Sequence, residues 1–220
     1  MKPAWVRIAT LPVTATQFAE LVPLPGETYL YKLESVDVYG TRDTAMVIDT
    51  DRNLYAYSSD NVTRLKVSAG IAGDLLAAGN RYGSNLIVRV EEAAGNSAEG
   101  VFRSVSFKGF RVPGNESVAD LGFSRPEVDV SLRYEVSGGQ VVPSGVLLSH
   151  AGPAVSLPAA SAADGLGMFW YNGAKFMKLF GDVDATSQTV AVQTSRPGTY
   201  QIRSLSRTQG VHFDLSQMTN

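Results

Sequence analysis

Residues 165–203, GLGMFWYNGAKFMKLFGDVDATSQTVAVQTSRPGTYQIR, constrain the fold more than any other stretch of this chain. Short runs of aromatic and β-branched residues alternate there with turn residues, a pattern typical of strands joined in hairpins. Asn172-Gly173 predicts a two-residue type I′ turn, because both central residues of that turn need positive φ. Pro197-Gly198 predicts a second turn before a last strand. We therefore expect four short strands in two hairpins.

Residues 128–136, VDVSLRYEV, give the clearest alternation in the chain, since every second residue is apolar. The apolar face of this predicted strand consists of Val128, Val130, Leu132, Tyr134 and Val136. Elsewhere the pattern predicts strands at residues 85–91 and 102–107, a helical turn at 74–78, and loops at 109–124 and 152–167. The sequence therefore predicts an all-β protein, built as an antiparallel β-sandwich.

The composition excludes several classes of protein. The net charge is -2 and basic residues are scattered, which argues against nucleic acid as a partner because a phosphate-binding face needs a local excess of Lys and Arg. The chain has no cysteine, so it has no disulfide framework, thiol nucleophile or cysteine-ligated metal site. No window holds about 18 consecutive apolar residues, so we expect no membrane span.

The sequence offers no catalytic constellation. His150 follows Ser149 directly, and neighbours on a strand point to opposite faces, so these two do not form a Ser–His dyad. His212, the other histidine, lies in a polar tail. The G-x-S-x-G, P-loop and H-E-x-x-H motifs are absent. We therefore predict that the protein is not an enzyme.

A short acidic stretch begins like a calcium-binding loop. Asp49, Asp51 and Asn53 follow the D-x-D-x-N pattern, and Asp60 stands at the twelfth position of that loop. Leu54 occupies the sixth position, which needs Gly for a sharp turn, and the flanking residues read as strands where the loop needs helices. Two interpretations remain, a calcium site built from these four residues or a polar turn between strands, and the missing Gly favours the turn.

Aromatic residues of the predicted hairpin are the remaining candidates for ligand binding. Trp170, Tyr171 and Phe176 could form a surface on which sugars stack, together with the tyrosines at positions 55 and 57. The alternative is that these side chains fill the core of the sandwich. Alternation places Phe169 and Tyr171 on the face opposite Trp170, so one of the two sets is expected to be exposed.

The first 48 residues resemble the second half of a fibronectin type III module. Val6 and Ile8 alternate with Arg7 like a half-buried strand, residues 14–21 predict another, and irregular alternation in residues 28–40 predicts a bulge. The resemblance is carried by Pro25-Gly26-Glu27-Thr28-Tyr29-x-Tyr31-x-Leu33-x-x-Val36-Asp37-x-x-Gly40. It implies an incomplete β-unit, whose missing strands are expected upstream in a longer gene product, in another chain or in the following domain.

Residues 60–205 resemble a β-sandwich of the ankyrin and netrin-receptor type, as found in large bacterial surface proteins. The resemblance is carried in order by Asn85-Leu-Ile-Val-Arg-Val, Phe123-Ser-Arg-Pro126, Val128 to Tyr134, Met168 to Gly173, Asp182-Val-Asp184, Thr189-Val-x-Val192 and Gly198-Thr199-Tyr200. Phe176 stands where this family often has Trp. The resemblance implies an adhesion, scaffold or spacer module, and it transfers no enzymatic residue.

Together these features predict three regions: a fibronectin-like β-unit at residues 1–48, a β-sandwich domain at 49–206 and a tail at 207–220. The expected function is a non-enzymatic structural or adhesive module of an exported or cell-surface bacterial protein, because residues 1–15 lack the apolar run of a signal peptide and the chain reads as part of a longer one. Expected partners are neighbouring domains or further copies of the chain, paired through exposed strand edges. The alternative is a carbohydrate-binding module of an extracellular enzyme.

Overall fold

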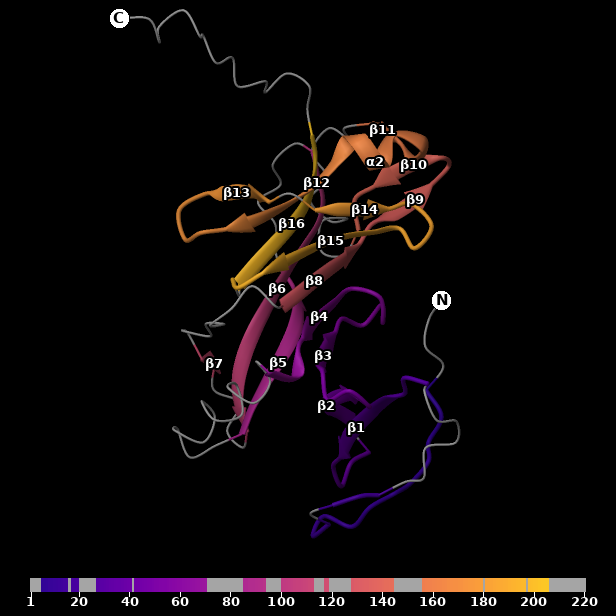
Figure 1. Cartoon of the computed structure of the whole chain (residues 1–220), viewed down its shortest axis with the longest axis vertical. Coiled ribbons are helices and arrows are strands. Elements are labelled where there is room, and N and C mark those ends of the chain that lie inside the picture. Colours follow the sequence, from indigo (N-terminus) through magenta and orange to yellow (C-terminus); the bar gives the residue numbers. More distant parts are fainter. Residues whose placement is uncertain are drawn as a thin grey trace, which may run out of the picture. The chain divides into compact units, whose positions relative to one another are not determined.

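The computed structural model describes residues 5–15, 17–19, 27–40, 42–70, 85–93, 100–112, 117–118, 128–144, 156–179, 181–196 and 198–205. Its strands pair in antiparallel fashion and form three sheets (Figure 1). The predicted all-β, antiparallel sandwich class is therefore confirmed. No helix in the described part of the chain has the length and apolar character needed to cross a membrane.

The elements follow one another along the chain with short connections. In order they are β1 (Leu30–Val36), β2 (Arg42–Asp49), β3 (Leu54–Tyr57), β4 (Arg64–Val67), β5 (Asn85–Glu92), β6 (Val101–Val112), β7 (Ser117–Val118), β8 (Val128–Arg133), β9 (Glu135–Ser137), β10 (Gln140–Val142), β11 (Leu157–Pro158), the 3-10 turn η2 (Ala159–Ser161), α2 (Ala162–Gly165), β12 (Leu166–Tyr171), β13 (Phe176–Leu179), β14 (Asp182–Asp184), β15 (Thr189–Thr194) and β16 (Gly198–Ser204).

The strand order differs between the three sheets. The largest sheet runs β1-β2-β3-β4-β8-β15-β14. The second runs β13-β12-β16-β6-β5, with β7 paired to β6, and the smallest runs β11-β10-β9. The predicted strands at residues 85–91 and 102–107 correspond to β5 and β6 and are confirmed.

The chain forms two compact units, each built from segments that are distant in sequence. The first contains Met1–Val90, Phe107–Val130 and Gln193–Pro197, and the second contains Glu91–Ser106, Ser131–Val192 and Gly198–Asn220. The predicted division after residue 48 stays a prediction. The predicted tail at 207–220 and the predicted helical turn at 74–78 lie outside the described residues.

In the first unit, β1 to β4 form consecutive antiparallel pairs. The register shifts between Leu33 and Glu34, which pair with Met46 and Thr44, so that Ala45 is an extra residue in β2. The bulge expected from the irregular alternation is therefore confirmed. Inward-facing residues of these strands build a small core, with Val47, Leu65 and Val67 almost fully buried.

The strands predicted before residue 27 are not found among the described residues. Residues 5–15 and 17–19 have no strand, and the side chains of Val6 and Ile8 are exposed. Alternating sequence produces a strand only where a neighbouring strand accepts and donates the backbone hydrogen bonds and a core covers one face. Neither condition is met for Val6 and Ile8, so this prediction was wrong.

The clearest predicted strand is buried on the expected face but is shorter than expected. Val128, Val130, Leu132 and Tyr134 are at most 1% exposed. The strand β8 ends at Arg133, and the backbone N–H of Tyr134 donates to the carbonyl of Gln188 at 2.9 Å instead of continuing the ladder. The residues after Tyr134 form β9, which belongs to the smallest sheet.

The core of the second unit lies between strands of two sheets. Leu132 and Val190 come from the largest sheet, while Met168, Tyr200 and Ile202 come from the second sheet, and all five are fully buried. Side chains from two facing sheets that interdigitate in this way are the defining feature of a β-sandwich.

The connection between β12 and β13 is longer than predicted. The strands end at Tyr171 and resume at Phe176, so the loop has four residues where the Asn-Gly pair predicted two. Of these, Gly173 has positive φ, at 95°, and Asn172 does not. The Asn172 side chain instead accepts hydrogen bonds from the N–H groups of Ala174 and Lys175, which stabilises the longer loop.

Two predicted loops also contain regular structure. The loop predicted at residues 109–124 begins with the last residues of β6, which pair with β7. The loop predicted at 152–167 contains β11, η2, α2 and the first residues of β12. Its Ala- and Ser-rich sequence lacked a helical hydrophobic period, because α2 is a single turn with one buried residue, Ala162.

Candidate functional site

The predicted calcium ligands lie in two neighbouring hairpin turns. Asp49 ends β2 and is 4% exposed. Its Oδ1 accepts the N–H groups of Asp51 at 3.0 Å and of Asn53 at 2.9 Å, and its Oδ2 accepts the Asn53 amide at 2.9 Å and the Tyr55 hydroxyl at 2.8 Å. The structure thus brings Asp49 and Asn53 together, with Asp51 exposed in the turn.

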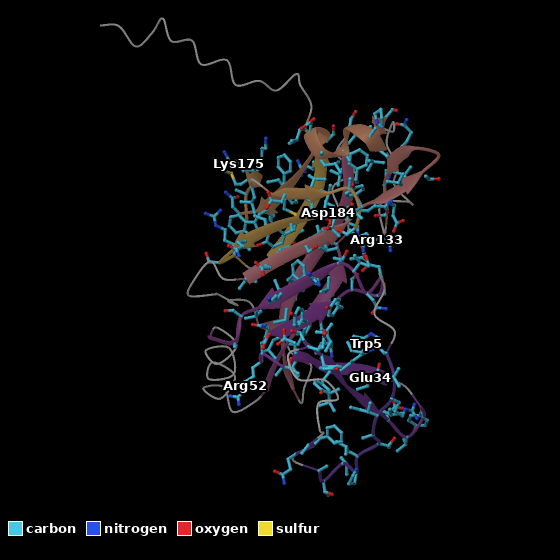
Figure 2. The ribbon with its side chains drawn as sticks, turned by 45° about the vertical axis from the view of Figure 1, so that its right-hand side comes forward. Trp5, Glu34, Arg52, Arg133, Lys175 and Asp184 are labelled. Atoms are coloured by element: carbon cyan, nitrogen blue, oxygen red, sulfur yellow. The ribbon has the colours of Figure 1, made fainter. Side chains whose placement is uncertain are left out.

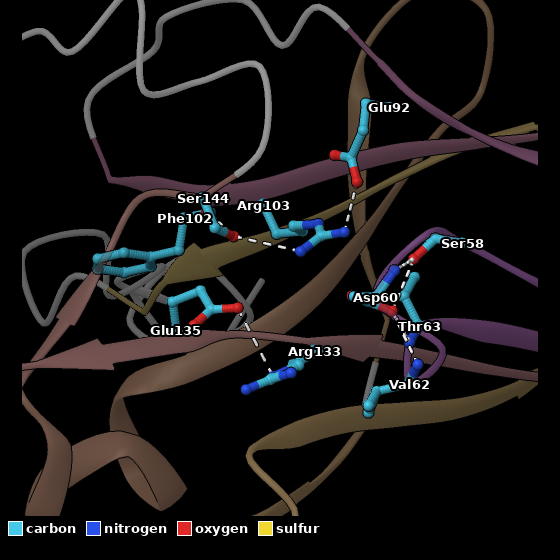
Figure 3. Close-up of polar contacts among 10 residues, drawn as sticks. All are labelled: Ser58, Asp60, Val62, Thr63, Glu92, Phe102, Arg103, Arg133, Glu135 and Ser144. Atoms are coloured by element: carbon cyan, nitrogen blue, oxygen red, sulfur yellow. Dashed lines mark hydrogen bonds and ion pairs between the residues drawn. The ribbon is translucent and has the colours of Figure 1, made fainter. Parts of the chain in front are cut away.

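Asp60 organises the turn between β3 and β4 in the same manner. Its Oδ1 accepts the Ser58 hydroxyl at 2.7 Å and the N–H groups of Val62 and Thr63 at 2.8 and 2.7 Å (Figure 3). Its Oδ2 accepts the Thr63 hydroxyl at 2.8 Å. Both aspartates therefore act as acceptors that fix the backbone of a turn.

These bonds decide what the two carboxylates can do. A carboxylate offers about four lone-pair sites, and four donors of the protein already occupy those of Asp49 and of Asp60. Within the described ranges, no group of three or more His, Cys, Asp or Glu side chains is arranged to hold a metal ion. Calcium binding stays a prediction, and the geometry favours the polar turn.

The same bonds shift the titration of both carboxyls. Burial alone would raise the pKa of Asp49, but hydrogen bonds from Asn53, Tyr55 and Asp51 outweigh it and hold that pKa below its ordinary value. Burial is likewise outweighed at Asp60, where bonds from Ser58, Val62 and Thr63 lower the pKa. Burial and the bond to Asp49 raise the pKa of the Tyr55 phenol.

We expect the free energy of unfolding to fall below about pH 4. The pKa values of Asp49 and Asp60 are lower in the folded than in the unfolded protein, so their stabilisation is fully present above the unfolded pKa and is lost as pH falls through the folded pKa. Urea unfolding at several pH values from 7 to 3 measures this. A free energy of unfolding that stays constant to pH 3 would contradict the assignment.

The aromatic hairpin is the second candidate site, and the structure separates its predicted members. Tyr171 and Phe176 are direct cross-strand partners, with ring centroids 5.1 Å apart and planes inclined by 45°. Trp170 is half-buried on the opposite face, where its cross-strand partner is the buried Tyr200. Tyr171 is 38% exposed, and its hydroxyl donates to the Gly173 carbonyl at 2.8 Å, which fixes the ring.

Sequence reasoning missed one member of this face, Arg203 in β16. Its guanidinium carbon lies 4.2 Å from the ring centroid of Phe176 and 5.3 Å from that of Phe169. Both distances fall within the range of cation–π contacts. Residues 169 and 203 are 34 positions apart, so only the pairing of β12 with β16 reveals the contact.

A buried ion pair in the second unit was also missed. Arg103 of β6 is 3% exposed and pairs with Glu92 of β5 (Figure 3). Its Nη1 donates to the Ser144 hydroxyl at 3.5 Å. Arg103 alternates with buried residues on both sides, because the first half of β6 is covered on both faces, and such a strand gives no alternating pattern.

Comparison with known proteins identifies no relative. No protein-family model, curated protein or solved structure matches the chain. The resemblances to fibronectin type III and to the ankyrin and netrin-receptor sandwich therefore stay predictions. His150 and His212 lie outside the described residues, as do Phe123 to Pro126.

Proposed function

We propose that this chain is a non-enzymatic structural or adhesive module, exported or displayed at a bacterial cell surface, that pairs with a second copy of itself through the edge strand β1. The observation that carries the proposal is the position of β1 at the end of the largest sheet, where it pairs with β2 alone. Leu33 and Val36 of this edge are 54% and 58% exposed. An open edge with exposed apolar residues is a template for another strand.

The charges of β1 favour pairing with an identical strand. Lys32 and Glu34 flank Leu33, and their side chains form an ion pair at 2.6 Å, with the Lys32 ammonium 5.6 Å from the ring centroid of Trp5 (Figure 2 labels Trp5 and Glu34). In an antiparallel pair with a two-fold axis at Leu33, Lys32 of each copy stands opposite Glu34 of the other. The edge therefore matches itself in shape and in charge.

The substitution Leu33→Lys tests this proposal. It places two like charges beside each other on the two-fold axis, and like charges directly opposite destabilise a strand pair. We expect sedimentation velocity over a concentration series to show a concentration-dependent dimer for the natural chain and a monomer for the variant.

The matched control is Val13→Lys, which changes an apolar residue that is fully exposed and lies outside the strands. This variant should associate like the natural chain. A natural chain that stays monomeric, or a Leu33→Lys variant that dimerises equally well, would rule out pairing through β1.

A second candidate function is carbohydrate binding at the β12–β13 hairpin. The observation in its favour is that Tyr171 and Phe176 share one face of the hairpin, with the Tyr171 ring exposed and held in place. A sugar ring can stack its C–H face on such an aromatic ring, which combines an apolar body with a polar edge.

A further inference from the structure

One face of the strands β13, β12 and β16 gathers aromatic and cationic side chains. Directly paired residues point to the same face, so Tyr171 shares a face with Phe176, and Phe169 shares it with Lys178 and Gln201. The contacts of Arg203 with the rings of Phe169 and Phe176 place its guanidinium on this face as well. We call these three strands with their side chains on this face the aromatic platform.

Gln201 fixes the orientation of the guanidinium. Its Oε1 accepts the Nε–H of Arg203 at 2.7 Å, and its own Nε2 donates to the Ser104 hydroxyl at 3.2 Å. Gln201 is 1% exposed, so this bond is shielded from water. Stacking on two rings and the bond to Gln201 hold Arg203 before any ligand arrives, which lowers the entropic cost of binding.

Arg203 keeps donors for a ligand. Its two Nη groups donate to no residue in the described part of the chain, and none of those residues forms an ion pair with it. The side chain is half-buried, so a reduced exposure to water strengthens its interaction with an anion. Paired N–H groups of a guanidinium match the two oxygens of a carboxylate.

The local charge is positive although the chain is acidic overall. Residues 166–179 and 198–205, which include all of the strands β12, β13 and β16, contain Lys175, Lys178 and Arg203 but no Asp or Glu. Lys175 lies at the outer end of the hairpin (Figure 2). A local excess of cations in a chain of net charge -2 selects for an anionic ligand.

We infer that the aromatic platform binds an acidic polysaccharide, with the carboxylate of a uronic acid on Arg203 and a neighbouring sugar ring stacked on Tyr171. This inference rests on the proposal that the hairpin binds carbohydrate, and it adds the chemical class of the sugar. A flat, fixed ring beside a fixed guanidinium suits a rigid pyranose that carries a carboxylate. An acidic peptide has no comparable flat apolar face to place on Tyr171.

The test uses isothermal titration calorimetry of the full chain with an α-1,4-linked galacturonate hexasaccharide and with its methyl ester. The ester keeps every sugar ring but removes the charge, so this comparison does not depend on how a variant folds. We expect the acid to bind and the ester to bind about tenfold more weakly or not at all, because a hydrogen-bonded ion pair is lost.

Protein variants then assign the contact. Arg203→Met keeps the apolar stem on the two rings and removes the guanidinium, and should weaken binding of the acid about tenfold or more. Arg203→Lys keeps a charge without the paired donors and should weaken binding less. The matched control is Arg133→Met in β8, whose arginine already pairs with Glu135, and it should bind like the natural chain.

Each remaining outcome would overturn a definite part of the account. Equal binding of acid and ester would leave carbohydrate binding standing and remove the carboxylate contact. Binding of neither sugar would remove both. Binding of the acid that Arg203→Met leaves unchanged would place the anion elsewhere, and tighter binding of poly-glutamate than of the hexasaccharide would replace the sugar with a peptide.

Discussion

Replacing Glu92 by glutamine is expected to lower the free energy of unfolding by about 3 kcal/mol. Glu92 carries the negative charge of the pair with Arg103, whose side chain is 3% exposed and therefore largely removed from water. Glutamine keeps the shape but leaves the buried guanidinium without this charge. Breaking a buried pair on one side costs about 3–5 kcal/mol, and the partial exposure of Glu92 favours the lower end.

The matched control is Glu135→Gln, which neutralises the pair between Arg133 and Glu135 at 3.6 Å (Figure 3). Both of these side chains reach solvent, so the loss should stay below about 1 kcal/mol. Urea unfolding at pH 7 measures both variants. Equal losses in the two variants would mean that burial does not set the strength of the Arg103 pair.

Asp49→Asn is the second substitution with a large expected effect, a loss of about 2–3 kcal/mol. The Asp49 carboxylate accepts four hydrogen bonds in the β2–β3 turn while almost fully buried. Asparagine replaces one acceptor oxygen by a donor, which then faces the Tyr55 hydroxyl or the Asn53 amide. A buried donor without an acceptor costs more than the bond it once formed contributed.

Asp184→Asn provides the comparison for this turn. Asp184 accepts the N–H groups of Thr186 and Ser187 and the Ser187 hydroxyl in the turn between β14 and β15, but it is exposed. Water can replace each of these bonds, so the urea midpoint should change much less than for Asp49→Asn. A larger change at Asp184 than at Asp49 would contradict the role given to burial.

Much of the fold was predictable because alternation reports a strand with one buried face. This holds for β8, where Val128, Val130 and Leu132 are buried as expected, and for β5. The sequence failed where a strand has no partner, as at Val6 and Ile8, because alternation cannot report whether another strand lies alongside. It also failed at the β12–β13 loop, where hydrogen bonds from the loop to Asn172 stabilise four residues instead of two.

The candidate sites were predictable only in part. The D-x-D-x-N pattern located the turn at Asp49, but the same residue types form calcium loops and polar turns, and only the hydrogen-bond partners distinguish the two. Alternation correctly placed Tyr171 opposite Trp170. Arg203 and Gln201 could not be found, because they join the platform through strand pairing across about 30 residues of intervening chain.

The central claim, pairing of two copies through β1, is tested most directly by mixing two charge-reversed variants. Lys32→Glu gives an edge with two acidic residues around Leu33, and Glu34→Lys gives one with two basic residues. Each variant alone should be monomeric, because like charges stand opposite each other in the self-paired strand. In an antiparallel pair of the two variants, every acidic residue faces a basic one.

Sedimentation velocity of the equimolar mixture is the deciding measurement. The account predicts that the mixture dimerises at concentrations where each variant alone stays monomeric. A mixture that behaves as the sum of two monomers, or single variants that dimerise as well as the natural chain, would show that β1 is not the surface through which copies associate.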